Sequence, residues 1–157
     1  MAAERGERAS TLLLFPAAVL VVVVLAAIVV DSSIAFLGER ELAHATAAAA
    51  NDAATEAIDD QAFYRSDRVE LDPDAVEHFA VQRVVASLDA GRHHDLEVEA
   101  TAVPPPRPGC PWEVRVRAAA NVDYLFARAI PGGPRRARVE ATSVAAPRQE
   151  PGTSCAP

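Results

Sequence analysis

Lysine is absent from the chain, and cysteine and aromatic residues are scarce. All fifteen basic residues are therefore arginines, a bias from which we draw no mechanism. The two cysteines are too few to build a fold from disulfides, and they do not stand in the CxxC spacing typical of small metal-binding domains. Because twenty-two acidic residues outnumber the arginines, the formal charge is −7, which disfavours binding to the phosphates of nucleic acids.

Sequence motifs of common catalytic sites are missing as well. The chain has no GxSxG nucleophile elbow, no glycine-rich phosphate loop, and no histidine near either cysteine in the sequence. His93 and His94 form the one histidine pair, but neighbours on a strand point to opposite faces, so we expect a solvated turn and no metal chelate. We therefore expect a protein that is not an enzyme and that holds neither a metal ion nor a cofactor.

A long uncharged run is the strongest signal in the sequence. Residues 11–30, from Thr11 through Pro16 to Val30, carry no charge, and as a helix they would span about 30 Å, the hydrocarbon thickness of a bilayer. A cleaved secretory signal is the alternative, but its apolar region is ordinarily only ~7–15 residues long, which favours a retained transmembrane helix. Asp31 closes the run, where it would either pair with a cation of a neighbouring subunit or simply end the hydrophobic segment.

Charges beside this run predict its orientation in the cytoplasmic membrane. Arg5, Arg8 and the amino terminus precede the run, whereas only Arg40 follows it closely. The positive-inside rule then places residues 1–10 in the cytoplasm and the rest of the chain outside. Since that compartment is oxidising, we expect the two cysteines to form a disulfide in preference to two free thiols: Cys110 and Cys155.

An alanine-rich stretch follows the span and predicts a helical stalk over residues 31–63. Nine alanines fall among residues 43–57, and alanine is the best helix former. Gly38 is the expected weak point of this rod. The stalk packs either on the chain's own domain or on helices of other subunits, and both alternatives stay open. The candidate assembly face consists of one large and four small residues at helical spacing: Leu42, Ala45, Ala49, Ala53 and Ala57.

The remaining chain predicts a small α+β head over residues 64–146. Asp72 and Pro73 mark the start of a short helix, and Gly91 marks its stop. Alternation of apolar and polar residues then predicts a sheet of four antiparallel strands whose one open face the helices cover. These strands are expected around residues 96–102, 112–118, 122–130 and 135–145.

Charge placement supports pairing of the first two strands as a hairpin. Glu97 and Glu99 would then face Arg115 and Arg117, and cross-strand pairs of opposite charge stabilise a hairpin. After the last strand, residues 147–157 are rich in proline and small polar residues, and we expect a flexible tail.

The N-terminal third of the chain resembles a known family, the TadE/TadG-like proteins of Tad (Flp-type) pilus assembly. The resemblance is carried by the Arg5-Gly6 pair, Pro16 within the span, Asp31 after it, and Arg40-Glu41-Leu42 leading into the alanine-rich stretch. It implies a single-pass protein of the inner membrane that acts structurally, as a minor pseudopilin-like or assembly component of a pilus or a related secretion system. The head would be pilin-like in outline.

The same resemblance implies the partners and one possible modification. Partners would be the lipid bilayer and other pilin-like or pilus-assembly membrane proteins. Gly6 is a possible processing site, although Thr11 stands where prepilin-type cleavage calls for a glutamate. Longer family members carry a metal-binding DxSxS motif, which this chain lacks. The alternatives are a membrane-anchored extracytoplasmic binding module and a small protein secreted after signal cleavage.

Overall fold

The computed structural model describes residues 4–66, 69–107 and 110–147. They form a long helix, α1 (Glu4–Glu56), and the shorter helices α2 (Asp60–Ser66) and α3 (Pro73–Ser87). An antiparallel sheet follows, and a 3-10 turn, η1 (Ala127–Ala129), separates its last two strands. The chain is thus α+β, as the sequence predicts. The strands are β1 (His93–Val103), β2 (Glu113–Asp123) and β3 (Arg136–Ala145).

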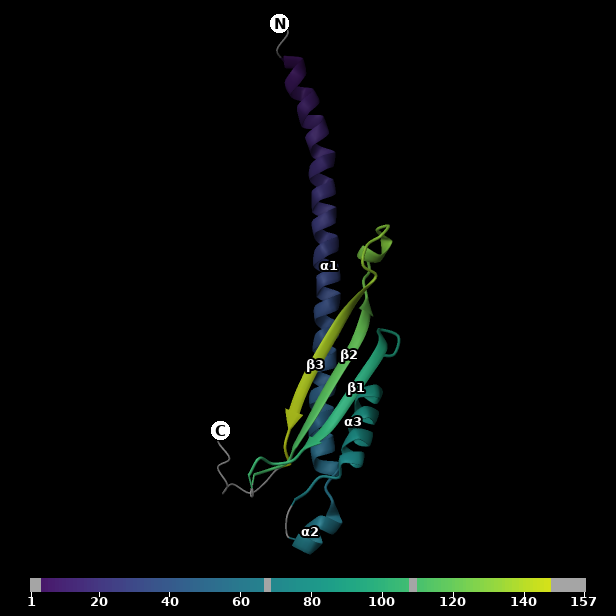
Figure 1. Ribbon diagram of the computed structural model, residues 1–157. Helices are drawn as coiled ribbons and strands as arrows, with labels where there is room; N and C mark the ends of the chain where they lie inside the picture. Colours follow the sequence, from purple (N-terminus) through teal and green to yellow (C-terminus); the bar gives the residue numbers. More distant parts are fainter. Residues whose placement is uncertain (1–3, 67–68, 108–109, 148–157) are drawn as a thin grey trace.

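Helix α1 is a rod of 53 residues that runs through the predicted span, Pro16 included, and on into the head. At ~1.5 Å per residue it is roughly 80 Å long. Figure 1 shows its N-terminal half standing clear of the rest of the chain, while the sheet and α3 lie along its C-terminal half.

Helix α1 ends at Glu56, so the prediction of one helix through residue 63 is wrong. Ile58 leaves the helix and pairs with Leu71 in an isolated antiparallel bridge. The Asp59 carboxylate then accepts the backbone N–H groups of residues 61 and 62, at 2.9 and 3.0 Å, and so caps α2. An aspartate that caps a new helix start competes with continuation of the old one.

The next helix forms where the sequence predicts it. Asp72 is the N-cap of α3, its carboxylate accepts the backbone N–H groups of residues 74 and 75, and Pro73 occupies the first turn. The buried face of α3 consists of Val76, Ala80 and Val84.

The described strands make a three-stranded sheet in the order β1-β2-β3, so the predicted fourth strand is not present. Residues 122–130, expected to be a strand of their own, instead complete β2 and enter a loop. Val122 lies in β2 and pairs with His93 on one side and Ala137 on the other. The loop then turns through η1 before β3 begins at Arg136.

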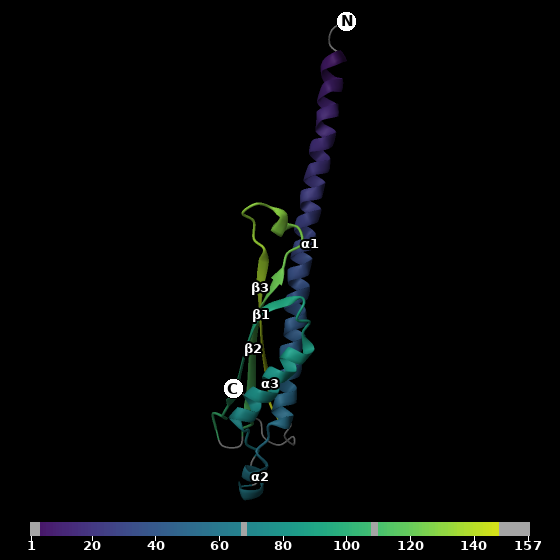
Figure 2. The ribbon, with the colours of Figure 1, turned by 90° about the vertical axis from the view of Figure 1, so that its right-hand side faces the viewer.

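The head has two layers, with α1 and α3 on one face of the sheet (Figure 2). The core between the layers contains Val114 and Val116 of β2, both fully buried, together with apolar residues of both helices. On α1 these are almost all alanines, which lets the helix axis lie close to the sheet. Thr46 of α1 is also buried there, and its hydroxyl lies 3.1 Å from the Ser143 hydroxyl of β3.

The other sheet face carries charges in exposed ion pairs. Glu99 lies opposite Arg117 in the register of β1 and β2, as the sequence predicts, but Glu97 lies opposite Ala119 and Arg115 opposite Thr101, so the rest of the predicted pairing is wrong. However, Arg117 bonds to Glu140 of β3 at 3.1 Å. Arg138 of β3 bonds to the same Glu140 at 3.0 Å and reaches across β2 to Glu97 at 2.9 Å. These pairs hold the pKa of Glu140 below its ordinary value, because Arg138 first and then Arg117 donate hydrogen bonds to its carboxylate.

Candidate functional site

The N-terminal half of α1 exposes large apolar side chains all round. Among the described residues, α1 is the one helix long and apolar enough to cross a membrane. Leu14, Leu20 and Val29 are each more than half exposed, and hardly any of this segment is covered by the head. The predicted boundaries of the span, Thr11 and Val30, both lie within α1. A membrane anchor and an uncleaved signal segment share this composition and length.

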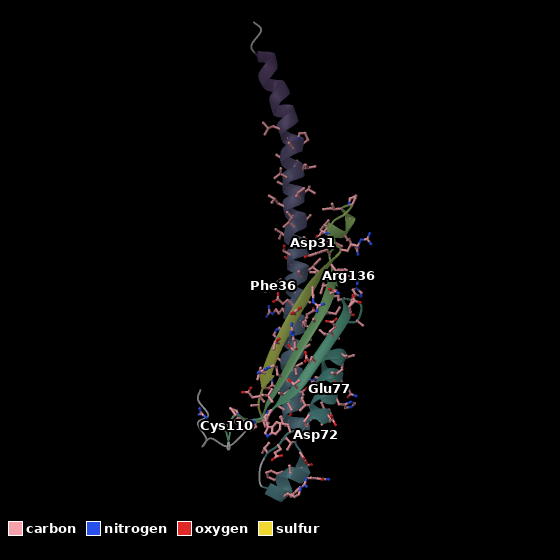
Figure 3. All side chains as sticks on the ribbon, in the orientation of Figure 1. Asp31, Phe36, Asp72, Glu77, Cys110 and Arg136 are labelled. Atoms are coloured by element: carbon pink, nitrogen blue, oxygen red, sulfur yellow. The ribbon has the colours of Figure 1, made fainter. Side chains whose placement is uncertain are left out.

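Asp31 lies directly after this apolar segment and contacts the loop between β2 and β3. Its Oδ1 accepts the backbone N–H groups of Leu125 at 2.8 Å and Phe126 at 3.0 Å, and its Oδ2 accepts that of Ala127 at 2.7 Å. Figure 3 shows Asp31 on α1 at the level of this loop. The side chain is thereby almost fully buried, with Asp31 only 7% exposed.

The carboxylate of Asp31 is stabilised in its charged form. Burial raises the pKa of this group, but the three backbone N–H groups and the nearby Arg128 outweigh that effect and hold the pKa below its ordinary value. The Asp31 carboxylate therefore caps the η1 turn, although Asp31 lies in a distant part of the chain. From the sequence, Asp31 either pairs with a cation of a neighbouring subunit or simply ends the hydrophobic segment, whereas in the structure its partners lie in its own chain.

Gly38 is a second point of close contact between α1 and β2. A Cβ atom added at Gly38 would lie 2.7 Å from Cγ2 of Val122, closer than real side chains approach. The absence of a side chain therefore lets the strand approach the helix two turns after Asp31. Gly38 is not a weak point of α1, since the helix passes through it unbroken to Glu56.

The candidate assembly face of the stalk is buried in the chain's own core. Between 0 and 4% of each of these residues is exposed, and four of the five belong to the core cluster with β2, β3 and α3. The structure thus corrects the idea of a face free for other subunits, because the sheet already covers it. The residues concerned are Leu42, Ala45, Ala49, Ala53 and Ala57.

His93 and His94 do not both lie in the solvated turn that the sequence predicts. His93 begins β1 and is buried, with its Nε2 3.9 Å from Glu41 Oε2, and neither ring nitrogen has a hydrogen-bond partner among the described residues. The prediction of a solvated turn is wrong for His93, because the strand begins there and turns the ring toward α1. His94 faces Asp123 instead, at 3.5 Å. Within the described ranges, no three histidine, cysteine, aspartate or glutamate residues gather as metal ligands would.

The remaining predicted sites lie at the two ends of the chain. Gly6 belongs to the first turns of α1, and its processing stays a prediction. Within the described residues no cysteine is free. Cys155 lies outside the described residues, and so does most of the predicted tail, so the pairing of Cys110 with Cys155 also stays a prediction.

Sequence reasoning missed the β2–β3 loop as a functional element. Tyr124 and Phe126 alternate with other residues as a strand would, and that pattern hid the loop. The signal that could have revealed it is the Pro-Gly-Gly-Pro turn at residues 131–134, which leaves the preceding apolar residues at the tip of a hairpin. Comparison of the chain with models of protein families, with curated proteins and with solved structures found no match.

Proposed function

We propose that this protein is a single-pass membrane protein that acts structurally in a Tad/Flp-type pilus or a related secretion assembly, as a minor pseudopilin-like or assembly component. The observation that carries the proposal is the continuity of α1. One helix begins as an exposed apolar segment and ends as the core of an antiparallel α+β head. That outline agrees with the one implied by the resemblance of the N-terminal residues to the TadE/TadG-like family.

The contacts of Asp31 favour an anchor that is retained. The small residue that ends Ser33-Ile34-Ala35 is where a signal would be cleaved, and cleavage there would remove Asp31 and leave three backbone N–H groups of the β2–β3 loop without their acceptor. It would also separate the apolar half of α1 from the half that forms the core of the head. A secreted form would thus lose contacts that the folded head uses, so the anchored form is the better fit.

The proposed topology follows from the charges beside the span. The N-terminus lies in the cytoplasm and the head lies outside the cytoplasmic membrane. Because the alanine face of the stalk is covered by the sheet, the surface left for helices of partner proteins is the exposed apolar half of α1. Helices in a bilayer associate by side-chain packing, so partners of like kind would contact this half.

Photo-crosslinking in the native host tests the assembly role. A photoreactive amino acid is placed in turn at residues 20–23, which together cover every side of the helix. The matched control carries it at Tyr64, an exposed residue of α2 at the opposite end of the molecule. We expect adducts with other single-pass, pilin-like proteins from the span positions.

Two other outcomes contradict the proposal. Adducts with lipid alone at all four span positions would remove the assembly role. Protein adducts from Tyr64 without any from the span would favour the alternative, an anchored binding module whose head meets its partner. Mass analysis of the same samples shows whether residues 1–6 have been removed by processing at Gly6.

A further inference from the structure

We propose that the tip of the β2–β3 hairpin, residues 124–135, is a second membrane contact that rests in the headgroup layer of the bilayer spanned by α1. We call these residues the hairpin tip. The inference rests on the proposed anchor and goes beyond it, because it assigns a lipid-binding surface to the head. The partner is the lipid surface itself.

Contacts with α1 fix the position of the hairpin tip along the helix. Asp31 is the first residue after the uncharged run, and it bonds to three successive backbone N–H groups of the tip. Any bilayer that holds residues 11–30 therefore has its outer surface at the level of the hairpin tip. Figure 1 shows this loop as the part of the head that reaches furthest toward the N-terminal half of α1.

The side chains of the hairpin tip suit the boundary between headgroups and acyl chains. Leu125, Phe126 and Ile130 are 48, 45 and 62% exposed, and they gather in one short stretch of the loop that bonds to Asp31. On α1, Phe36 lies just beyond Asp31 and is 62% exposed, which adds a further large apolar side chain near this level of the helix. Together these residues form an apolar zone around the helix exit.

Charge on the hairpin tip favours lipid phosphates. The chain carries a net charge of −7, yet residues 124–139 contain four arginines and no acidic residue. Arg136 and Arg138 are held in ion pairs on the sheet, whereas Arg128 and Arg135 are exposed and form no ion pair within the described residues. Two such arginines beside exposed apolar side chains suit a membrane surface, because guanidinium groups bind lipid phosphates while the apolar side chains enter the acyl boundary.

The membrane contact would give the head a defined orientation. A single helix can rotate about its own axis and tilt in the bilayer, and the head turns with it because α1 continues into the head core. A second contact, bonded to α1 through Asp31, fixes the direction in which the sheet and the distal helix α2 project. Partner proteins would then always meet the same face of the head.

Fluorescence quenching of the full chain in proteoliposomes tests this contact. The vesicles contain phosphatidylcholine and phosphatidylglycerol whose acyl chains are brominated either near the headgroup or near the methyl end. Phe126→Trp and Ile130→Trp report on the hairpin tip, and the second position keeps the test decisive if one variant folds poorly. Leu20→Trp marks the middle of the span and Tyr64→Trp the distal end of the head, while the wild type, with Trp112 alone, supplies the background.

We expect the two hairpin-tip reporters to lose more fluorescence with bromines near the headgroup (shallow) than with bromines near the methyl end (deep). The reason is that interfacial segments lie only about 5–10 Å deep in the bilayer. Leu20→Trp should be quenched more by deep bromines, and Tyr64→Trp should match the background. Quenching of Leu20→Trp without quenching at either hairpin-tip position would overturn the membrane contact and leave the anchor standing. If Leu20→Trp is not quenched, the anchor fails and the inference fails with it.

Discussion

At the scale of single residues, Asp31 joins the apolar half of α1 to the head. Its carboxylate receives three backbone N–H groups from a loop more than ninety residues away in the sequence. Charged hydrogen bonds of this kind are stronger than neutral ones, and removing the acceptor leaves several donors unpaired at once. The loop would then lose the contact that holds it against α1.

Replacement of Asp31 by alanine is therefore expected to destabilise the head while leaving membrane insertion intact. We expect Asp31→Ala to lower the melting temperature of the detergent-solubilised chain by on the order of 5 °C, followed by circular dichroism. Glu99→Gln is the matched control, since Glu99 is exposed and forms no ion pair within the described residues. Equal melting temperatures for Asp31→Ala and wild type would show that the loop does not depend on this carboxylate.

The same carboxylate predicts how stability depends on pH. The pKa of Asp31 in the folded chain lies below its ordinary value of 3.8, so the unfolded chain binds the proton more readily. Its contribution is fully present above about pH 4 and is lost as the pH falls through the folded pKa. Between about pH 6 and pH 3, wild type should lose more stability than Asp31→Asn. Parallel losses in thermal melts of the two proteins would contradict this.

Replacing Gly38 by alanine should lower stability, although alanine has the higher helix propensity. Alanine is favoured over glycine within a helix by about 1 kcal/mol, but the added methyl group would overlap Val122, and overpacking costs about 1–3 kcal/mol. We expect Gly38→Ala to lower the free energy of unfolding by about 1 kcal/mol. Combined with Val122→Ala, it should cost less than the sum of the two single changes in denaturant unfolding. Strict additivity would show that the two sites do not touch.

At the scale of elements, the alanine-rich half of α1 serves the head and not a neighbouring chain. Ala49 and Ala53 are fully buried beneath the sheet, so a larger side chain there must displace the strands. Ala43 lies on the same helix but is exposed, and it offers a matched control. The small size of these alanines is what sets the distance between helix and sheet.

Enlarging the buried alanines should thus unfold the head of an isolated chain. We expect Ala49→Leu and Ala53→Leu each to cost about 1–3 kcal/mol, or to prevent folding, whereas Ala43→Leu should stay near wild type. Chemical denaturation of the purified, monomeric chain measures this. If all three variants are as stable as wild type, the face is not packed against the sheet and is again available to other subunits.

Elements with a local signal were predictable from the sequence, and those that depend on distant contacts were not. The N-cap at Asp72 and the alternation along β1 and β2 predicted α3 and the first hairpin closely. The end of α1 was missed because Asp59 caps a new helix inside an otherwise helical stretch. At the candidate site, the sequence singled out Asp31 by its position but not its partners, because those partners are backbone N–H groups, which every residue except proline carries.

At the scale of the whole molecule, α1 has two roles along one continuous helix. Its first half presents apolar side chains to the surroundings, and its second half forms the core of the head. Asp31 (Figure 3) marks the boundary together with Gly38, where the hairpin of β2 and β3 meets the helix. We propose that the two halves stay joined in the mature protein, so that the head remains attached to the apolar segment.

The intact mass of the protein recovered from membranes and from the medium of its native host tests that claim most directly. We predict a chain in the membrane fraction that retains the apolar segment, either whole or shortened only by residues 1–6 through processing at Gly6. A soluble chain that begins near Phe36 would contradict the account. It would lack Asp31, and the anchor, the assembly role and the membrane contact of the hairpin tip would all have to be abandoned.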